Sequence, residues 1–394
     1  MNGVEGYMYP NEIHVYWSIL IVLYPYITGL VAGAFILASL VRIFRVEAIK
    51  PTYRLALLTA LSFLIVAPLP LQLHLGHPER SPEMYFTPHS TSAMAMFGYI
   101  YLWYLMAVLV FEIWLDYRKE IVLLSRSSKG LLRILYKVMT LGSDNVSPHS
   151  LHIDERVGWI VTLIGIPSAF LLHGYVGFIF GSIKANPWWS SPLMPVVFIF
   201  SAMVSGIAAV MLIYMVTTKM RGLNTDVHCL DAIGMYMFYI FVIDFGLEML
   251  DLIHRIYEAD ESFRSLDFMV HSKLFLSQII LQLLLGTMVP LVLLFITQVA
   301  GSSLSEIARK VMYTISGSFA LIGIFAMRWN VVIGGQLFSK SFLGYTTYKI
   351  ELVTREGLLP AIIFILLPFG ILTVLIKLLP PWPAKGLPQA VAGD

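Results

Sequence analysis

Long apolar segments constrain the fold of this chain more than any other feature. A window of about 20 residues, the length at which an α-helix crosses a bilayer, finds nine of them. They lie near residues 14–43, 53–75, 92–115, 157–181, 193–217, 230–254, 273–299, 310–334 and 359–379. Because lipid offers the backbone no hydrogen-bond partner, such segments must be helical. We therefore predict an all-α integral membrane protein with about nine transmembrane helices.

Composition agrees with this class and excludes several others. Hydrophobic residues make up 58% of the 394 residues and charged residues only 13%, far from the soluble globular average. The single cysteine, Cys229, excludes an internal disulfide and a thiolate-ligated iron–sulfur cluster within this chain. No basic cluster with interleaved aromatic residues suggests nucleic acid, so the bilayer is the expected partner.

The distribution of positive charge predicts the orientation. With the N-terminus outside, most of the 26 lysines and arginines fall on the cytoplasmic side, as the positive-inside rule expects. Nine spans then place the C-terminus in the cytoplasm. The basic stretch 116–156 is predicted to form an amphipathic helix on the inner membrane surface, between Arg118 and Lys137. Pro167 is predicted to interrupt the fourth span.

The sixth span carries three carboxyl groups within an otherwise apolar helix. Asp244, Glu248 and Asp251 are four and then three residues apart, which stacks them on one face. A carboxyl group at membrane depth costs about 2.5–3.5 kcal/mol at the helix centre on the insertion scale, so function is the default interpretation. The alternative is a set of interhelical hydrogen bonds. Three acids on one face favour a proton path over this structural role.

Other polar residues accompany these acids. Gln278 and Gln282, in the seventh span, are four residues apart and are predicted to face the acidic helix. Arg328 lies near the outer boundary of the eighth span, where it joins a polar cluster or snorkels to the interface.

Three functions compete for this scaffold. A haem-binding b-type cytochrome needs paired axial histidines, but His173 is the only one of ten histidines well inside a span. A secondary transporter would show matching broken helices in two halves, and no such repeat is visible. A quinone site needs an apolar slot capped by a few hydrogen-bonding groups. Seven residues are predicted to project to the outer end of the first four spans: His14, Tyr16, His77, Glu79, Arg80, His173 and Tyr175.

Two stretches carry a resemblance to a known family. The outer LGHPER segment at residues 75–80, with the first four spans, resembles the NrfD/PsrC family of polysulfide-reductase-like membrane subunits. The resemblance covers about residues 10–340. The RWNVVIGGQ stretch at residues 328–336 resembles more particularly the DsrP-type members, which belong to Dsr complexes associated with sulfite reduction.

The resemblance implies an architecture and a function. It implies a first four-helix bundle over 1–185 with a quinone site, a second over 186–340 with the proton path, and an outer loop, last helix and tail over 341–394. The substrate would be menaquinone or menaquinol, with no haem or iron–sulfur cluster in this chain. The implied partners are an extracytoplasmic ferredoxin-like iron–sulfur subunit, a cytochrome c and a haem b membrane subunit. Such a membrane protein is not catalytic alone and serves sulfate or sulfite respiration.

The family motif also suggests roles for individual residues. Carried onto this sequence, LGHPER places His77, Glu79 and Arg80 at the cap of the quinone pocket, while His173 and Tyr175 contribute to its walls. His77 or Glu79 would exchange a proton with the quinol, since a group that titrates near neutral pH suits this chemistry. Arg80 would stabilise negative charge on the quinone or simply pair with Glu79.

Overall fold

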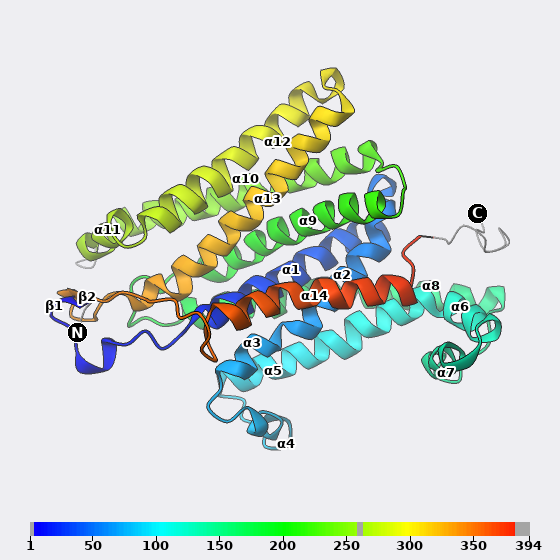
Figure 1. The fold of residues 1–394 in the computed structure, drawn as a ribbon, viewed down its shortest axis with the longest axis horizontal. Helices are drawn as coiled ribbons and strands as arrows, with labels where there is room; N and C mark the ends of the chain where they lie inside the picture. The colour runs from blue at the N-terminus through cyan, green and yellow to red at the C-terminus, as the bar shows by residue number, and fades with distance from the viewer. Residues whose placement is uncertain (1–3, 258–262, 383–394) are drawn as a thin grey trace.

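The computed structural model describes residues 4–257 and 263–382 and consists almost entirely of helices (Figure 1). The α-helices are α1 (Ile19–Arg42), α2 (Tyr53–Val66), α3 (Pro68–His74), α4 (Glu83–Phe86), α5 (Ala93–Trp103), α6 (Phe111–Ser127), α7 (Gly130–Met139), α8 (Pro148–Gly181), α9 (Met194–Met220), α10 (Val227–Tyr257), α11 (Phe263–His271), α12 (Val289–Ala300), α13 (Glu306–Val332) and α14 (Leu358–Leu378).

Shorter elements complete the fold. The segments η4 (Tyr104–Val110) and η5 (Phe275–Met288) are π-helical and continue the α-helices beside them. Short 3₁₀ helices occur at η1 (Pro10–Glu12), η2 (Glu47–Thr52), η3 (Pro78–Arg80), η6 (Gly301–Ser303) and η7 (Gly334–Gln336). Two short strands, β1 (Glu5–Gly6) and β2 (Gly344–Tyr345), pair antiparallel with Glu5 opposite Tyr345. They tie the start of the chain to the segment before α14.

The prediction of nine membrane-spanning helices is confirmed for the part of the chain that the structure describes. The segments long and apolar enough to cross a membrane are Ile19–Arg42, Glu47–His74, Ala93–Ser127, Pro148–Gly181, Met194–Met220, Val227–His254, Phe275–Ala300, Glu306–Gln336 and Leu358–Leu378. The first and last of these start at the same end of the molecule and run in the same direction (Figure 1). This arrangement is the one that an odd number of crossings requires.

Helix α1 forms the centre of the bundle. Nearly all of its side chains are buried, and it packs against α2, α8, α9 and α13. Glycine permits the closest of these approaches, because a Cβ atom at Gly33 would lie 2.2 Å from the carbonyl oxygen of Ala202 in α9. A Cβ atom at Gly206 would in turn meet the backbone of Gly33 at 2.4 Å. Close contact between α1 and α9 joins the two halves of the chain.

The predicted division at residues 185 and 340 stays a prediction, and residues 383–394 of the third part lie outside the described residues.

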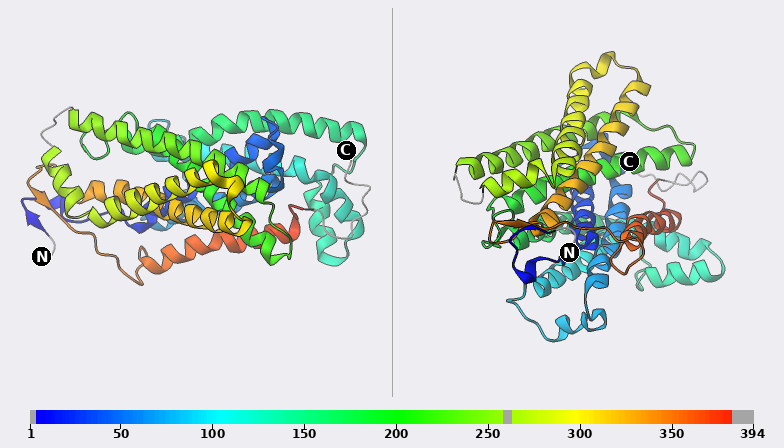
Figure 2. Two further views of the ribbon diagram at one scale, coloured as in Figure 1. Left: turned by 90° about the horizontal axis from the view of Figure 1, so that it is seen from above. Right: turned by 60° about the vertical axis from the view of Figure 1, so that its left-hand side comes forward.

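A second glycine contact organises the other half of the bundle. Gly286 of η5 and Gly323 of α13 approach so closely that a Cβ atom on Gly286 would lie 2.2 Å from the Cα atom of Gly323. Helices α12 and α13 run side by side in all three views (Figures 1 and 2). The close approach of Gly286 and Gly323 positions the polar side chains of η5 against those of α13.

The predicted interruption at Pro167 is wrong. Helix α8 runs without a break from Pro148 to Gly181, although proline supplies no backbone N–H. The hydroxyl group of the next residue, Ser168, donates to the carbonyl oxygen of Ile164 at 2.8 Å. The carbonyl group that Pro167 leaves without its usual N–H is that of Leu163, so the Ser168 bond reinforces the adjacent turn rather than replacing the missing one.

The inner amphipathic segment also differs from its prediction. Residues 118–127 extend the helix of the third span, and only α7 forms a separate amphipathic helix. Gly130 adopts a φ of 62°, a left-handed conformation suited to glycine, and this turn separates α6 from α7. The indole N–H of Trp114 donates to the carbonyl oxygen of Met139 at 2.9 Å and holds α7 against α6.

Candidate functional site

A buried arginine lies at the centre of the candidate site. The side chain of Arg328, on α13, has no exposed surface, so its snorkelling to the interface, one of the two predicted alternatives, is wrong. Its Nη2 atom donates to Ser201 Oγ at 2.7 Å and to His173 Nε2 at 3.0 Å. The guanidinium carbon lies 3.9 Å from the ring centroid of Phe198, at cation–π distance. A buried charge is expensive unless it is well bonded. These contacts from α8 and α9 bond one side of the guanidinium, whereas its Nε atom has no hydrogen-bond partner among the described residues.

The contact with Arg328 determines the tautomer of His173. Arginine can only donate, so Nε2 of His173 must accept and the ring proton resides on Nδ1. Nδ1 lies 3.3 Å from the hydroxyl oxygen of Thr28, on α1, and that hydroxyl group donates to the carbonyl oxygen of Tyr24 at 3.0 Å. A Cβ atom at Gly29 would lie only 3.2 Å from the imidazole. His173 is therefore a neutral, fully bonded group in the interior of the helix bundle rather than a residue that projects to the outer end of the first four spans.

The acidic residues of α10 make contacts with different elements. Asp244 is buried, and its Oδ1 atom has no hydrogen-bond partner among the described residues. Glu248 accepts hydrogen bonds from the amide nitrogen of Gln282 at 3.3 and 3.4 Å. Asp251 accepts a hydrogen bond from the hydroxyl group of Ser191. The row thus leads from the buried interior towards the segment that precedes α9.

A chain of amides extends the acidic row across η5. Gln282 accepts from the amide group of Asn330 at 2.8 Å, and Asn330 accepts from the hydroxyl group of Ser277 at 2.5 Å. The Oε1 atom of Gln278 is buried without a partner among the described residues. Because η5 is π-helical, residues four apart do not superimpose as they do in an α-helix. Of the two predicted glutamines, the structure bonds Gln282 to the acidic row.

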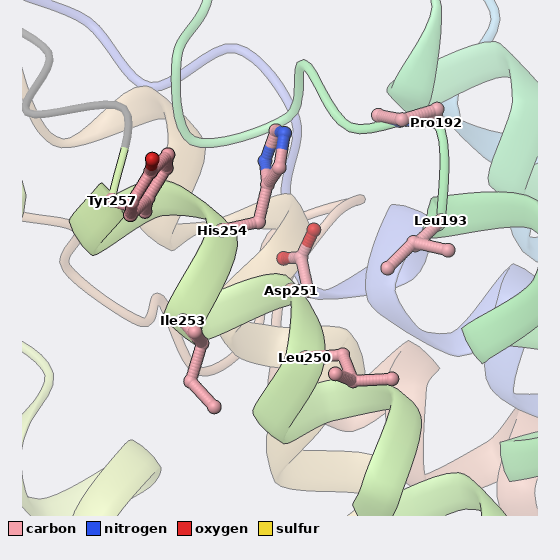
Figure 3. Close-up of a pocket in the computed structure, with 7 residues that line it drawn as sticks. All are labelled: Pro192, Leu193, Leu250, Asp251, Ile253, His254 and Tyr257. Carbon is pink, nitrogen blue, oxygen red and sulfur yellow. The ribbon is translucent and has the colours of Figure 1, made fainter.

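A cavity opens at the outer end of α10. Its volume is about 360 Å³, and its lining residues are Pro192, Leu193, Leu250, Asp251, Ile253, His254 and Tyr257. Figure 3 shows Asp251 and His254 on neighbouring turns of α10, with Leu193 across from Asp251. The cavity combines apolar walls with a carboxyl and an imidazole group, a combination found in sites for small amphiphilic ligands.

The polar side chains of the LGHPER segment are exposed and pair with residues two or three positions away. The side chains of His77 and Glu79 are 75% and 67% exposed, and their Nδ1 and Oε1 atoms are 3.0 Å apart. Arg80 pairs with Glu83 at 3.1 Å rather than with Glu79, which corrects the predicted pairing. The hydrogen bond from Arg80 lowers the pKa of the Glu83 carboxyl below its ordinary value.

Contacts with the segment before α14 anchor this outer region. His74 and Glu356 are joined at 2.7 Å, and the guanidinium of Arg355 donates to the carbonyl oxygen of Leu75 at 2.7 Å. The start of the LGHPER segment is thus fixed to a distant part of the chain, while its polar side chains face outwards.

The remaining predicted quinone residues lie on two other segments. His14 and Tyr16 are exposed and precede α1, whereas Tyr175 is half-buried on α8 with its ring 5.7 Å from that of Phe178. Among the seven predicted residues, the described hydrogen bonds join only His77 to Glu79. Their common role in quinone binding stays a prediction.

Sequence reasoning missed Thr28 and Ser201 as partners of the buried His173–Arg328 pair. Single hydroxyl residues in an apolar span are usually satisfied by their own helix, and both of these also bond to a carbonyl of the preceding turn. No signal in the sequence distinguished them from the other serines and threonines.

Comparison with known proteins identifies the family. Residues 10–340 match the model of the family described as polysulphide reductase, NrfD. A selenate reductase subunit of Mesobacillus selenatarsenatis is 34% identical over 203 residues, which cover 50% of this chain and 47% of that protein. Protein NrfD of Escherichia coli is 30% identical over 50% of this chain and 59% of its own length. A NrfD homolog of Haemophilus influenzae is 24% identical over 84% of this chain and 98% of its length.

Coverage differs between these relatives. The chain spans about half the length of the first two, and nearly the whole length of the third. The family match extends from the segment before α1 to the segment after η7. It therefore includes the LGHPER segment and the buried His173–Arg328 pair with its partners, which we call the buried centre. With its nine helices of membrane-spanning length in the described residues, the chain belongs to the polysulphide reductase NrfD family and is a multi-pass membrane protein.

Proposed function

We propose that this chain is the quinone-interacting membrane subunit of a respiratory reductase complex. Menaquinol or menaquinone would exchange two electrons and two protons at its outer face, and the electrons would pass to or from an extracytoplasmic iron–sulfur subunit. The N-terminus would lie outside and the C-terminus in the cytoplasm, in agreement with the positive-inside rule. The family match over residues 10–340 carries this proposal, and the name of the selenate reductase relative supports a place in a reductase complex.

The outer segment supplies the groups that quinol chemistry needs. His77 and Glu79 are hydrogen-bonded to one another and open to water, so the pair can accept a proton and release it to the exterior. Arg80 and the first and fourth spans, including His14, Tyr16 and Tyr175, would complete the site. Menaquinone would supply the redox chemistry, since the electrons need a carrier that this chain's own side chains do not provide.

The buried centre supports a role in proton handling by α10. Asp244 and Glu248 lie in the same polar region as Arg328, and Glu248 connects through Gln282 to α13. These acids, with Asp251 towards the outer cavity, would carry protons in the second half of the chain. We propose further that the partners include a cytochrome c and a haem b subunit and that the complex serves sulfur-compound respiration, as in DsrP-type relatives.

The geometry of His173 favours this function over a haem-binding cytochrome. An axial ligand must offer a ring nitrogen to iron, but Nε2 of His173 faces the donor of Arg328 and Nδ1 faces Thr28. An adjacent arginine would also repel a metal cation. His173 therefore fits a structural and electrostatic role between α1, α8 and α13.

One experiment tests the proposed function as a whole. In the purified complex, oxidation of a soluble menaquinol analogue should reduce the partner's redox centres. This chain, purified without its haem-carrying partners, should lack a haem Soret band in its visible spectrum. Substituting His77 with alanine should suppress the quinol reaction. A stoichiometric haem band in this chain, or full activity without His77, would overturn the proposal.

A further inference from the structure

A second row of carboxyl groups runs along α6, away from the acids of α10. Glu112, Asp116 and Glu120 are four residues apart, so they lie on one face of the helix, one turn above another. Exposure rises along the row, from 0% for Glu112 to 12% for the side chain of Asp116 and 25% for that of Glu120. The row thus leads from the bundle interior to the surface at the end where α6 meets α7 (Figure 1).

Basic groups from α1 and α2 face the outer part of this row. Arg42 pairs with Asp116 and also donates to the hydroxyl oxygen of Tyr53 at 2.7 Å. Arg54 pairs with Glu120 at 2.8 Å. Glu112 forms no salt bridge with any described residue, so direct ion pairs reach only the acids nearer the surface, although Arg42 also attracts Glu112 over a longer distance.

Each carboxyl group of the row retains one buried oxygen atom without a partner. Glu112 Oε2, Asp116 Oδ2 and Glu120 Oε2 have no hydrogen bond to any described residue. A buried carboxyl oxygen left unsatisfied costs free energy, so such atoms point to bound water or to a proton. Buried water occupies polar sites that offer it several partners, and a row of oxygens one turn apart is such a site.

Thr162 gives Glu112 a bonding arrangement for either protonation state. Its hydroxyl oxygen lies 2.6 Å from Glu112 Oε1 and 2.9 Å from the carbonyl oxygen of Gly158. A hydroxyl group has only one hydrogen to donate. When Glu112 is ionised, Thr162 donates to it; when Glu112 is protonated at Oε1, Glu112 donates to Thr162 and Thr162 donates to Gly158. Both states fit without movement of α6 or α8.

We infer that Glu112, Asp116 and Glu120 form a proton-entry path from the inner surface to the interior of the first half of the chain. A proton from water passes along the row to Glu112, and no covalent bond or electron is otherwise exchanged. This inference goes beyond the proposed quinone reaction. It rests on the proposed function in one respect: the surface at this end of α6 is the inner one only if the N-terminus lies outside. Its ligands are water and the proton, and its terminal acceptor is Glu112.

Infrared difference spectroscopy on the intact complex tests the path without any quinol. Spectra at acid and alkaline pH should show a protonated-carboxyl band that is present in the wild type and missing from Glu112→Gln. Glu47→Gln, an acid-to-amide change at an exposed position of the same end, should leave this band in place. A Glu112→Gln spectrum that superimposes on that of the wild type would overturn the inference.

Isotope exchange then tests the row itself. In Asp116→Asn, which keeps the shape but removes the titrating group, hydrogen–deuterium exchange at Glu112 should slow by about tenfold or more. Exchange at the wild-type rate would overturn the path. If Glu112→Gln fails to assemble, Thr162→Val serves instead, because loss of its hydrogen bond should shift the Glu112 band, and an unshifted band would contradict the arrangement. A complex that oxidises no quinol would refute the proposed function and leave these results readable.

Discussion

The outer segment and the buried centre use the same kinds of side chain in opposite surroundings. In the outer segment, Arg80 and His77 are mostly exposed and bond to acids two or three residues away. In the centre, Arg328 and His173 have no exposed surface and bond to each other across 155 positions of the sequence. Exposed pairs contribute little to stability, whereas removing one member of a buried pair is costly. We therefore expect the outer segment to exchange protons with solvent and the buried His173–Arg328 pair to support the structure.

The largest effect should follow removal of the buried charge. Arg328→Met leaves His173 and Ser201 without their shared donor and the acids of α10 without a nearby cation. We expect a loss of about 3–5 kcal/mol, seen as a lower thermal midpoint or failed assembly of the complex. Arg328→Lys should fall between this variant and the wild type. If the thermal midpoint of Arg328→Met were as high as that of Arg80→Gln, the buried arginine would contribute no more to stability than the exposed one.

The next effect should be on turnover alone. His77→Ala removes a proton acceptor from an exposed pair, so quinol oxidation should fall by about 100-fold while the thermal midpoint stays unchanged. His89→Ala is the matched control, because His89 lies in the same outer region and its side chain bonds only to Thr91 among the described residues. Equal losses of activity in both variants would indicate a general disturbance of the outer surface.

A smaller effect is expected within the buried acids. Glu248→Gln preserves shape and a hydrogen bond to Gln282 but cannot carry a proton. Turnover, or the number of protons moved per quinol, should fall by about tenfold with quinol binding unchanged. Proton release measured alongside quinol oxidation gives the result. If this variant and Asp244→Asn both moved the normal number of protons per quinol, the acids of α10 would have only a role in helix packing.

The smallest effect should come from the exposed ion pair. Arg80→Gln leaves Glu83 in water, so we expect no measurable change in the thermal midpoint at neutral pH. Because the pKa of Glu83 is lowered in the folded state, any contribution is present above its ordinary pKa and disappears as the pH falls through the lowered value. The thermal midpoints of the wild type and of Arg80→Gln should therefore converge as the pH falls from neutral to acid. A large loss confined to neutral pH would show that the outer segment also stabilises the fold.

Much of the fold was predictable because lipid imposes a simple rule on length and polarity. The nine spans follow from apolar runs, and the close approach at Gly33 follows from small residues in the first of them. The errors arose where local signals were overruled by context. Pro167 did not break α8, and the polar sequence after residue 115 did not end the third helix, which continues to Ser127.

The candidate site was predictable only in part. Of the acids of α10, Glu248 was correctly predicted to face Gln282, because the cost of burying polar groups demands partners. The depth of His173 and the burial of Arg328 depended on how α8, α9 and α13 pack, which no single segment encodes. The acidic row of α6 escaped notice because its residues lie at and beyond the predicted end of the span, where charges are ordinary.

We propose that this chain reacts with quinol at its outer face. The most direct test is a rapid-mixing measurement of partner-centre reduction by a menaquinol analogue in the intact complex. Reduction should depend on quinol, saturate with its concentration, persist in Glu47→Gln and be lost in His77→Ala. Reduction that proceeds equally well in His77→Ala, or a wild-type complex that quinol cannot reduce at all, would contradict the proposal.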